Sequence, residues 1–190
     1  MKSTFKLLSL ALCIALAFTS CKDDDDDDGN GGGTAISNNQ FKVGGTTYNL
    51  SSTGIYTNYG TGFGYDGYNL DLGITDKGFT LITNSSGQVD SVYGSGMVLY
   101  FECYTTDSTG FDLGTYHSDS IAPVPVKSFS FADYCINATT MDEGDCDEIK
   151  NCTLDVSKSG NVYTIIISGQ NSKGEAVKGK FVGELLESVF

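Results

Sequence analysis

The stretch CTLDVSKSGNVYTIIISGQNSKGEAVKGKFVGELL, residues 152–186, has the most regular pattern in the chain. Polar residues with glycine interrupt its apolar alternation at 157–161 and 170–174, which predicts three strands joined by two tight turns. In the last strand, one face is apolar and the other charged: Val177, Phe181 and Leu185 against Lys178, Lys180 and Glu184. This pattern is typical of an antiparallel meander with one solvated side.

A period of two also governs the sequence upstream. YNLDLGIT (68–75) alternates apolar and polar residues, whereas MVLYFECY (97–104) is apolar on both faces and predicts a central strand. No helix of two or more turns is predicted, and the nearest candidate, CDEIKNC (146–152), is one turn long. Five further strands are predicted, at TTYNLSS (46–52), GIYTNYG (54–60), FTLITNS (79–85), GTYHSD (114–119) and KSFSFADYCIN (127–137).

Short strands separated by frequent turns predict an all-β fold. We expect an antiparallel two-sheet β-sandwich of about eight to ten short strands, with a closed or partly open β-barrel as the alternative. The expected organisation is a signal peptide at 1–20, a tether at 21–40 and a single β domain at 41–190.

The first twenty residues have the layout of a secretory signal peptide, with a basic start and an apolar run from Leu7 to Phe18. A run of about twelve residues is too short to cross a bilayer core of about 30 Å as a helix. A small residue before Cys21 predicts lipoprotein processing, in which the signal is cut there and the Cys21 thiol receives a diacylglycerol. The rival, Cys13, follows the bulky Leu12 and would leave too short an apolar region.

A charged run follows the lipidation candidate: Lys22, Asp23, Asp24, Asp25, Asp26, Asp27 and Asp28. The motif SCKDDDDDD (20–28) resembles the export signal of Bacteroidota surface lipoproteins, with Phe18 where such signals usually carry leucine. The resemblance implies that lipoprotein export machinery reads the acids and moves the protein to the outer leaflet, facing the exterior. The alternative interpretation is a solvated, self-repelling spacer. The tract GNGGGTAISNN (29–39) predicts a flexible tether.

The body of the chain carries a second resemblance. The order FKVGGTTYNLSSTGIY (41–56), GMVLYFECY (96–104), GTYHSD (114–119) and then the C-terminal meander is similar to a large group of small all-β lipoprotein domains of Bacteroidota. The match spans most of residues 41–186 and consists of strand and turn patterns. It implies the fold class and the location, and it carries over no functional residue.

Composition excludes several classes of ligand. Removal of Lys2 and Lys6 with the signal leaves nine of eleven lysines against twenty-four acids, a net charge of about −15, which excludes nucleic acid as a partner. The chain has no arginine, so phosphorylated ligands are poor candidates. It has no tryptophan, although its tyrosines can stack on sugars. No cofactor is predicted.

Four cysteines remain in the body: Cys103, Cys135, Cys146 and Cys152. An even number in an exported chain predicts two disulfides. Three pairings are open, and we favour Cys146 with Cys152 and Cys103 with Cys135. Zinc is the alternative, but it would need paired CxxC spacings or histidines, which are missing.

No catalytic motif is found, and a non-enzymatic function is expected. His117, the single histidine, stands beside Ser118 and Asp119. Adjacent strand residues point to opposite faces, however, and triad members normally come from separate parts of a fold. A pair of converging carboxylates, as in glycosidases, stays open, because spacing alone singles out no pair.

The acidic loop MDEGDCDE (141–148) is a weak candidate for calcium. Its carboxylate ligands would be Asp142, Asp145, Asp147 and Glu148. The spacing is not that of an EF-hand loop, so a solvated acidic loop is the favoured interpretation.

The stretch GIYTNYGTGFGYDGYN (54–69) is a candidate binding surface, because aromatic residues stand there among glycines and polar residues. The patch would consist of Tyr56, Tyr59, Phe63 and Tyr65. Aromatic residues of strands usually pack inward, which is the competing interpretation.

Three Asp-Ser pairs, followed by Val, Thr or Ile, resemble the acceptor triplet for periplasmic O-glycosylation in Bacteroidota. The acceptors would be Ser91, Ser108 and Ser120. Asp-Ser pairs are also ordinary turn chemistry.

Taken with the N-terminal motif, these features favour an outer-membrane surface lipoprotein that serves as a non-catalytic binding or adhesion module for an extracellular ligand or surface protein. Contact with the membrane is expected through the lipid anchor only. One alternative is an extracellular hydrolase acting on glycan or peptide, which needs converging carboxylates. Another is an accessory or structural subunit of a surface complex, which needs an exposed apolar patch or an unpaired edge strand.

Overall fold

The computed structural model describes residues 35–62, 64–139 and 144–189. These ranges contain strands and no helix, which confirms the all-β prediction. None of the described residues forms a helix that is long and apolar enough to cross a membrane. The strands are β1 (Gln40–Val43), β2 (Thr46–Asn49), β3 (Thr53–Gly60), β4 (Tyr68–Thr75), β5 (Phe79–Thr83), β6 (Val89–Gly94), β7 (Gly96–Thr105), β8 (Gly114–Ser118), β9 (Ser128–Ala138), β10 (Asp145–Glu148), β11 (Lys150–Ser159), β12 (Val162–Gln170) and β13 (Ala176–Glu187).

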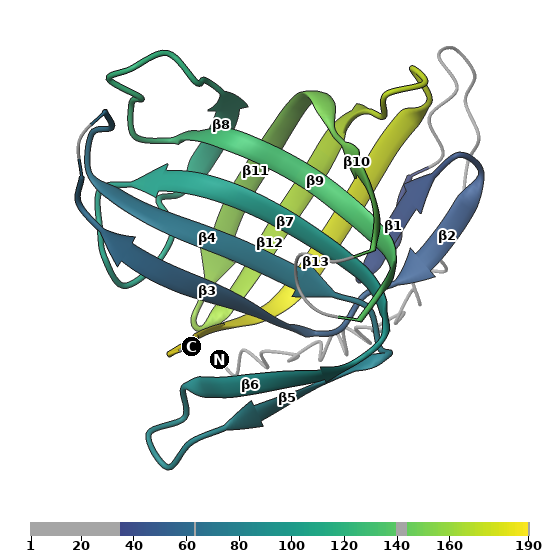
Figure 1. The fold of residues 1–190 in the computed structure, drawn as a ribbon, viewed down its shortest axis with the longest axis horizontal. Coiled ribbons are helices and arrows are strands. Elements are labelled where there is room, and N and C mark those ends of the chain that lie inside the picture. The colour runs from purple at the N-terminus through teal and green to yellow at the C-terminus, as the bar shows by residue number, and fades with distance from the viewer. Residues whose placement is uncertain (1–34, 63, 140–143, 190) are drawn as a thin grey trace, which may run out of the picture. The chain divides into compact units, whose positions relative to one another are not determined.

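The main sheet closes on itself as an eight-stranded barrel, in the order β12-β11-β8-β9-β7-β4-β3-β13 (Figure 1). Ala176–Gly183 of β13 pairs antiparallel with β12, and Glu184–Glu187 then pairs parallel with Thr53–Tyr56 of β3. Because β13 joins both ends of the sheet, the chain adopts the barrel that was the alternative architecture, and not the two-sheet sandwich. The predicted C-terminal meander is confirmed as β11, β12 and β13.

Closure depends on a close approach of two backbones. A Cβ atom on Gly183 would lie 1.8 Å from the carbonyl oxygen of Ser52, so only glycine fits where β13 passes the start of β3. The amide of Glu184 donates a hydrogen bond to that same carbonyl, at 3.1 Å. Gly54, in β3, lies opposite Leu185, whose side chain would be 2.8 Å from an added Cβ atom.

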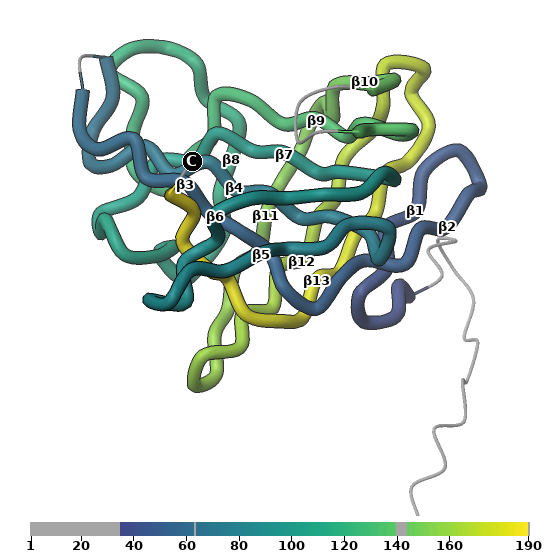
Figure 2. The backbone as a smooth tube through the Cα atoms, turned by 60° about the horizontal axis from the view of Figure 1, so that its bottom comes forward, coloured from purple at the N-terminus to yellow at the C-terminus, as the bar shows by residue number. Residues whose placement is uncertain are grey.

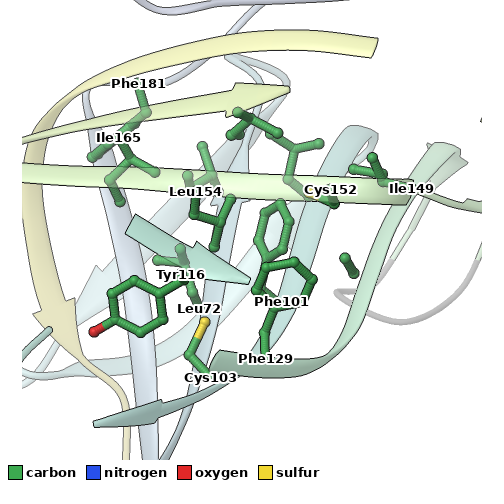
Figure 3. Packing of buried hydrophobic residues seen from close by; sticks show 14 of the residues in the cluster. Leu72, Phe101, Cys103, Tyr116, Phe129, Ile149, Cys152, Leu154, Ile165 and Phe181 are labelled. Carbon is green, nitrogen blue, oxygen red and sulfur yellow. The ribbon is translucent and has the colours of Figure 1, made fainter. Parts of the chain in front are cut away.

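Large apolar side chains fill the interior of the barrel, as expected when strands alternate between an inner and an outer face. Figure 3 shows this packing, in which Phe101 lies against Phe129 with 6.1 Å between the ring centroids. Phe111, from the segment between β7 and β8, packs edge-on against three tyrosines: Tyr56, Tyr116 and Tyr163. The interior is therefore a packed core.

Further strands lie outside the ring. The β1–β2 hairpin pairs with β13 through β1, and β10 pairs with β9. The β5–β6 hairpin forms a second, two-stranded sheet in front of the barrel wall (Figure 2). Its Phe79 and Val92 pack against Val98, Cys135 and Ala138 on the outer face of β7 and β9. The hairpin therefore covers part of the outside of the barrel.

Three strands were absent from the sequence-based prediction, namely β1, β6 and β10. Each of these strands has only four to six residues. Strand β1 pairs with the longer β13, β10 pairs with the longer β9, and β6 forms a hairpin with β5. The one-turn helix considered at 146–152 does not form. Cys146–Glu148 instead continues β10, and Ile149 is buried before β11 begins.

The predicted disulfide pairing is wrong. Cys135 is bonded to Cys146, and Cys103 and Cys152 are free and buried. The reason is geometric: β10 folds back on β9 so that Cys146 is the register partner of Cys135. Cys103 and Cys152 point into the barrel, whereas Cys135 faces outward, so a Cys103–Cys135 bond would have to pass through the wall.

Peptide mapping of the oxidised protein should recover Cys135 linked to Cys146. Cys103 and Cys152 should resist alkylation until denaturant is added, because burial raises the pKa of both thiols, that of Cys152 to about 12. The measurement is iodoacetamide labelling with and without urea, followed by mass spectrometry. Recovery of a Cys146–Cys152 or a Cys103–Cys135 peptide would contradict this assignment.

Gly183→Ala should lower the free energy of unfolding by about 3 kcal/mol or more, because the added methyl group overlaps the Ser52 carbonyl and forces β13 away from β3. The matched control is Gly174→Ala in the β12–β13 turn, where an added Cβ meets nothing within 4 Å and the φ of +80° alone costs about 1 kcal/mol. Urea unfolding followed by circular dichroism measures both. Equal losses for the two variants would show that the β13–β3 crossing is not a tight constraint.

Candidate functional site

Two carboxylates face each other on the outside of the barrel. Asp71 of β4 and Glu102 of β7 are register partners, and their chain neighbours Leu70, Leu72 and Phe101 point into the core. Like charges directly opposite each other on neighbouring strands are destabilising. An arrangement with no evident structural benefit is a reason to look for a functional one.

Polar side chains surround this pair, and we call the group the outer-face cluster: Asn69, Asp71, Tyr100, Glu102 and Ser130. The Tyr100 hydroxyl donates to Asp71 Oδ2, and the Ser130 hydroxyl donates to Glu102 Oε2. The Asn69 amide donates to Glu102 Oε1 at 2.9 Å. Two buried oxygens, Asp71 Oδ1 and Asn69 Oδ1, accept no hydrogen bond from the protein. The cluster therefore keeps unused acceptors, which is uncommon for buried polar groups.

A bulge in β9 completes the cluster. Glu102 pairs with Phe131 and Cys103 with Phe129, so Ser130 is an extra residue on its strand. Ser130 bonds Glu102, and its neighbour Phe131 packs edge-on against Tyr100 with 5.8 Å between the ring centroids. Because of the bulge, the side chains of Ser130 and Phe131, which are successive residues of β9, both lie on the outer face beside β7.

The electrostatics of the cluster are unfavourable for a second negative charge. The pKa of Asp71 is raised from its ordinary 3.8 to about 6: burial is the largest cause, the hydrogen bond from Tyr100 opposes the rise, and the Glu102 charge adds to it. Burial and the Asp71 carboxylate also raise the pKa of Tyr100. In the described ranges the only ion pair joins Lys150 and Glu148, at 3.9 Å. The Asp71–Glu102 pair is thus not neutralised by an ion pair.

Aromatic rings border the cluster. Phe131 is 46 % exposed and Tyr59, near Tyr100, is 62 % exposed. On the side toward the end of β7, Tyr65 packs against Tyr104 with tilted rings and 4.9 Å between the ring centroids. Tyr104 in turn lies 3.0 Å from Ser130, hydroxyl to hydroxyl. The rings and carboxylates together make a surface that offers both apolar contact and hydrogen-bond acceptors.

A surface pocket of about 230 Å³ adjoins the cluster and shares Ser130 with it, and Phe131, which borders the cluster, also lines the pocket. Its other lining residues include three acids: Asp133, Asp147 and Glu148. Asp133 is the register partner of Tyr100 on one side and of Glu148 on the other. Burial and the two neighbouring carboxylates raise the pKa of Asp133. A band of negative charge therefore runs from β4 across β7 and β9 to β10.

The structure brings only part of the predicted aromatic patch together: Tyr59 and Tyr65 border the outer-face cluster, whereas Tyr56 does not. Tyr56 belongs to the core, and its hydroxyl donates to the carbonyl of Thr109 at 3.2 Å. Tyr59 is exposed and Tyr65 packs on Tyr104, while Phe63 lies outside the described residues. Tyr56 and Tyr59 separate because they are three apart in a strand and so take opposite faces.

The residues predicted as calcium ligands are engaged within the protein or lie outside the described ranges, as Asp142 does. Asp147 accepts hydrogen bonds from Tyr134 and Ser172, and Asp145 accepts one from Asn137. In the part of the chain that the structure describes, no three Asp, Glu, His or Cys side chains are arranged to hold a metal.

The three glycosylation candidates stand in different settings. Ser91 is half-buried in β6, Ser108 is half-buried in the segment after β7, and Ser120 is exposed after β8. Asp107 and Asp119, which precede two of these serines, each accept a hydrogen bond from the amide two residues on. These are turn contacts of the ordinary kind.

His117 lies exposed on β8, and its backbone amide donates to Lys127. Cys21, Lys22 and the aspartates 23–28 lie outside the described residues.

No family model, curated protein or solved structure matches the chain. The interpretation of the site therefore depends on its own geometry.

Sequence reasoning missed the outer-face cluster. A signal was present, since YNLDLGIT and MVLYFECY each carry one acid inside an otherwise apolar or neutral strand. What the sequence does not contain is the β4–β7 register that sets Asp71 opposite Glu102, or the bulge that adds Ser130. The apolar pattern of MVLYFECY on both faces also hides the position of Tyr100, which is only half-buried on the outer face.

Asp71→Asn should stabilise the protein by about 1 to 3 kcal/mol near pH 7.5, and the gain should vanish near pH 4. The folded state holds the Asp71 proton more tightly than the unfolded state, so this group lowers stability as pH rises from about 4 to about 6. Asparagine keeps the shape and does not titrate. The measurement is the urea midpoint at both pH values, with Asp90→Asn, an exposed site in β6, as the control. A loss of stability near pH 7.5 would contradict the prediction.

Proposed function

We propose that the protein is an outer-membrane lipoprotein of the cell surface, anchored through Cys21, whose barrel is a non-catalytic binding or adhesion module. The N-terminal motif supports the location, because the acidic run after Cys21 resembles the surface-export signal. The outer-face cluster supports the binding function. In this proposal the ligand of the protein contacts the barrel wall around Asp71 and Glu102, between the exposed rings of Tyr59 and Phe131.

A single observation carries the binding function. Two buried acceptors, Asp71 Oδ1 and Asn69 Oδ1, hold no hydrogen-bond donor from the described residues, and exposed aromatic rings border the cluster to which they belong. A group that donates hydrogen bonds would satisfy them, and burying such acceptors without a partner costs about 1 to 3 kcal/mol each. Aromatic rings beside such acceptors supply contact area at low entropic cost. Both features favour capture of a ligand.

A hydrolase is the second candidate, because Asp71 and Glu102 are adjacent carboxylates and Asp71 has a raised pKa. Three of their four oxygens already accept hydrogen bonds from the protein, so Glu102 has no oxygen left, whereas a glycosidase needs two available carboxyl groups. A catalytic acid or base has to reach the reacting atom directly. The geometry therefore supports binding more strongly than hydrolysis.

The location is tested by proteinase K digestion of intact cells that carry the natural chain or a variant with alanine at 23–28. We expect the natural chain to be cut and the variant to be protected, because the resemblance assigns the acids to surface export. Protection of both chains in intact cells, with digestion of both in lysed cells, would contradict surface display.

The binding function is tested with the same cells on a panel of immobilised polysaccharides and peptides. The double change Tyr59→Ala and Phe131→Ala should lower retention on the bound member roughly tenfold or more, as expected for aromatic anchors. Tyr93→Ala is the matched control, since Tyr93 is also exposed (63 %) but lies on β6. Unchanged retention in the double variant would exclude this face, and turnover of a panel member that depends on Asp71 would favour the hydrolase.

A further inference from the structure

We propose that the outer-face cluster binds an alkylammonium group, presented as the lysine side chain of an extracellular peptide or as a free polyamine. This inference rests on the proposed binding function and specifies the chemistry of its ligand. It follows from three independent features of the wall: its charge, its unused acceptors and its rings.

The first feature is the negative charge of Asp71 and Glu102, which no basic side chain in the described ranges balances with an ion pair. Asp71 and Glu102 lie opposite each other, and none of the charged groups that raise or lower the pKa of Asp71 is a lysine. The chain contains no arginine that could neutralise the pair. Two carboxylates of which one is nine-tenths buried need a proton or a cation as counter-charge. A cationic ligand would supply that charge at neutral pH.

The acceptors favour an ammonium over a metal ion. Asp71 Oδ1 and Asn69 Oδ1 are buried and hold no donor from the part of the protein that the structure describes, while both Glu102 oxygens and Asp71 Oδ2 already hold protein donors. Calcium takes six to eight oxygen ligands, far more than the cluster offers. An ammonium has three donors, which match two side-chain oxygens and the carboxylate charge beside them.

The rings favour an organic cation over a sugar hydroxyl. Phe131 packs edge-on against Tyr100, and both Phe131 and Tyr59 are exposed next to the carboxylates. The face of such a ring attracts a cation within about 6 Å of its centre. The methylene chain of a lysine or a diamine would also cover the exposed apolar area of Phe131.

The adjoining acidic pocket extends the site. Asp133 lies beside Tyr100 in the register and, with Asp147 and Glu148, lines the pocket on the far side of Phe131. A ligand with two amino groups can therefore place one in the outer-face cluster and one in this pocket. Divalent amines should bind more tightly than monovalent ones, because the second contact is intramolecular.

The test is calorimetric titration of the full-length mature chain, held in a non-ionic detergent, with n-butylammonium, with cadaverine and with uncharged n-butanol. We expect both amines to bind, cadaverine more tightly, and the alcohol not to bind. Asp71→Asn and Glu102→Gln should each weaken amine binding roughly tenfold or more, as for the loss of a charged hydrogen-bond partner. Asp90→Asn is the control and should bind like the natural chain.

A short peptide with one internal lysine and blocked ends separates the two sources of the ammonium. Tighter binding of the peptide than of n-butylammonium assigns the site to protein lysines, whereas binding of the free diamine alone assigns it to polyamines. Equal amine affinity in the natural chain and in Asp71→Asn overturns the inference, as does calcium binding that requires Asp71. If retention of cells on the panel still depends on Tyr59 and Phe131, the binding function survives that failure.

Discussion

Strand β13 pairs with β12 along its first eight residues and with β3 along its last four, and the barrel exists because both pairings form at once. The change of partner occurs at Gly183, where the Ser52 carbonyl leaves no room for a side chain. Every other ladder of the ring is an ordinary neighbour contact that an open sheet would also have. Without this crossing, the interior faces of β4 and β12 would not meet around one core.

Closure also determines where function can reside. The interior is occupied by large side chains such as Tyr116, Phe101 and Phe129, so the barrel is a packed core. The proposed ligand site lies on the outer wall, where the alternation of β4 and β7 sets Asp71 against Glu102. The cluster lowers stability at neutral pH, because Asp71 must ionise while largely buried. Such a local cost, compensated by the core, is typical of a site retained for binding.

Much of the fold could be predicted from periodicity. The three C-terminal strands, β4 and β7 were placed within a few residues, because each presents a long alternation with an apolar face. The short strands β1 and β10 were missed, since four residues carry too little pattern to show an alternation. The disulfide prediction failed because β10 was missed. Cys135 and Cys146 become neighbours only when β10 folds back on β9.

By itself, the sequence determined the all-β class, the strands of the meander and the acidic, arginine-free composition that restricts the ligands, since these depend on residue type and local period. Only the tertiary structure decided between barrel and sandwich, paired Cys135 with Cys146, moved Tyr56 into the core and united Asp71 with Glu102 and Phe131. The physical reason is register. Which residues stand opposite each other across two strands depends on contacts between segments far apart in the chain, and a shift of one residue reverses every face.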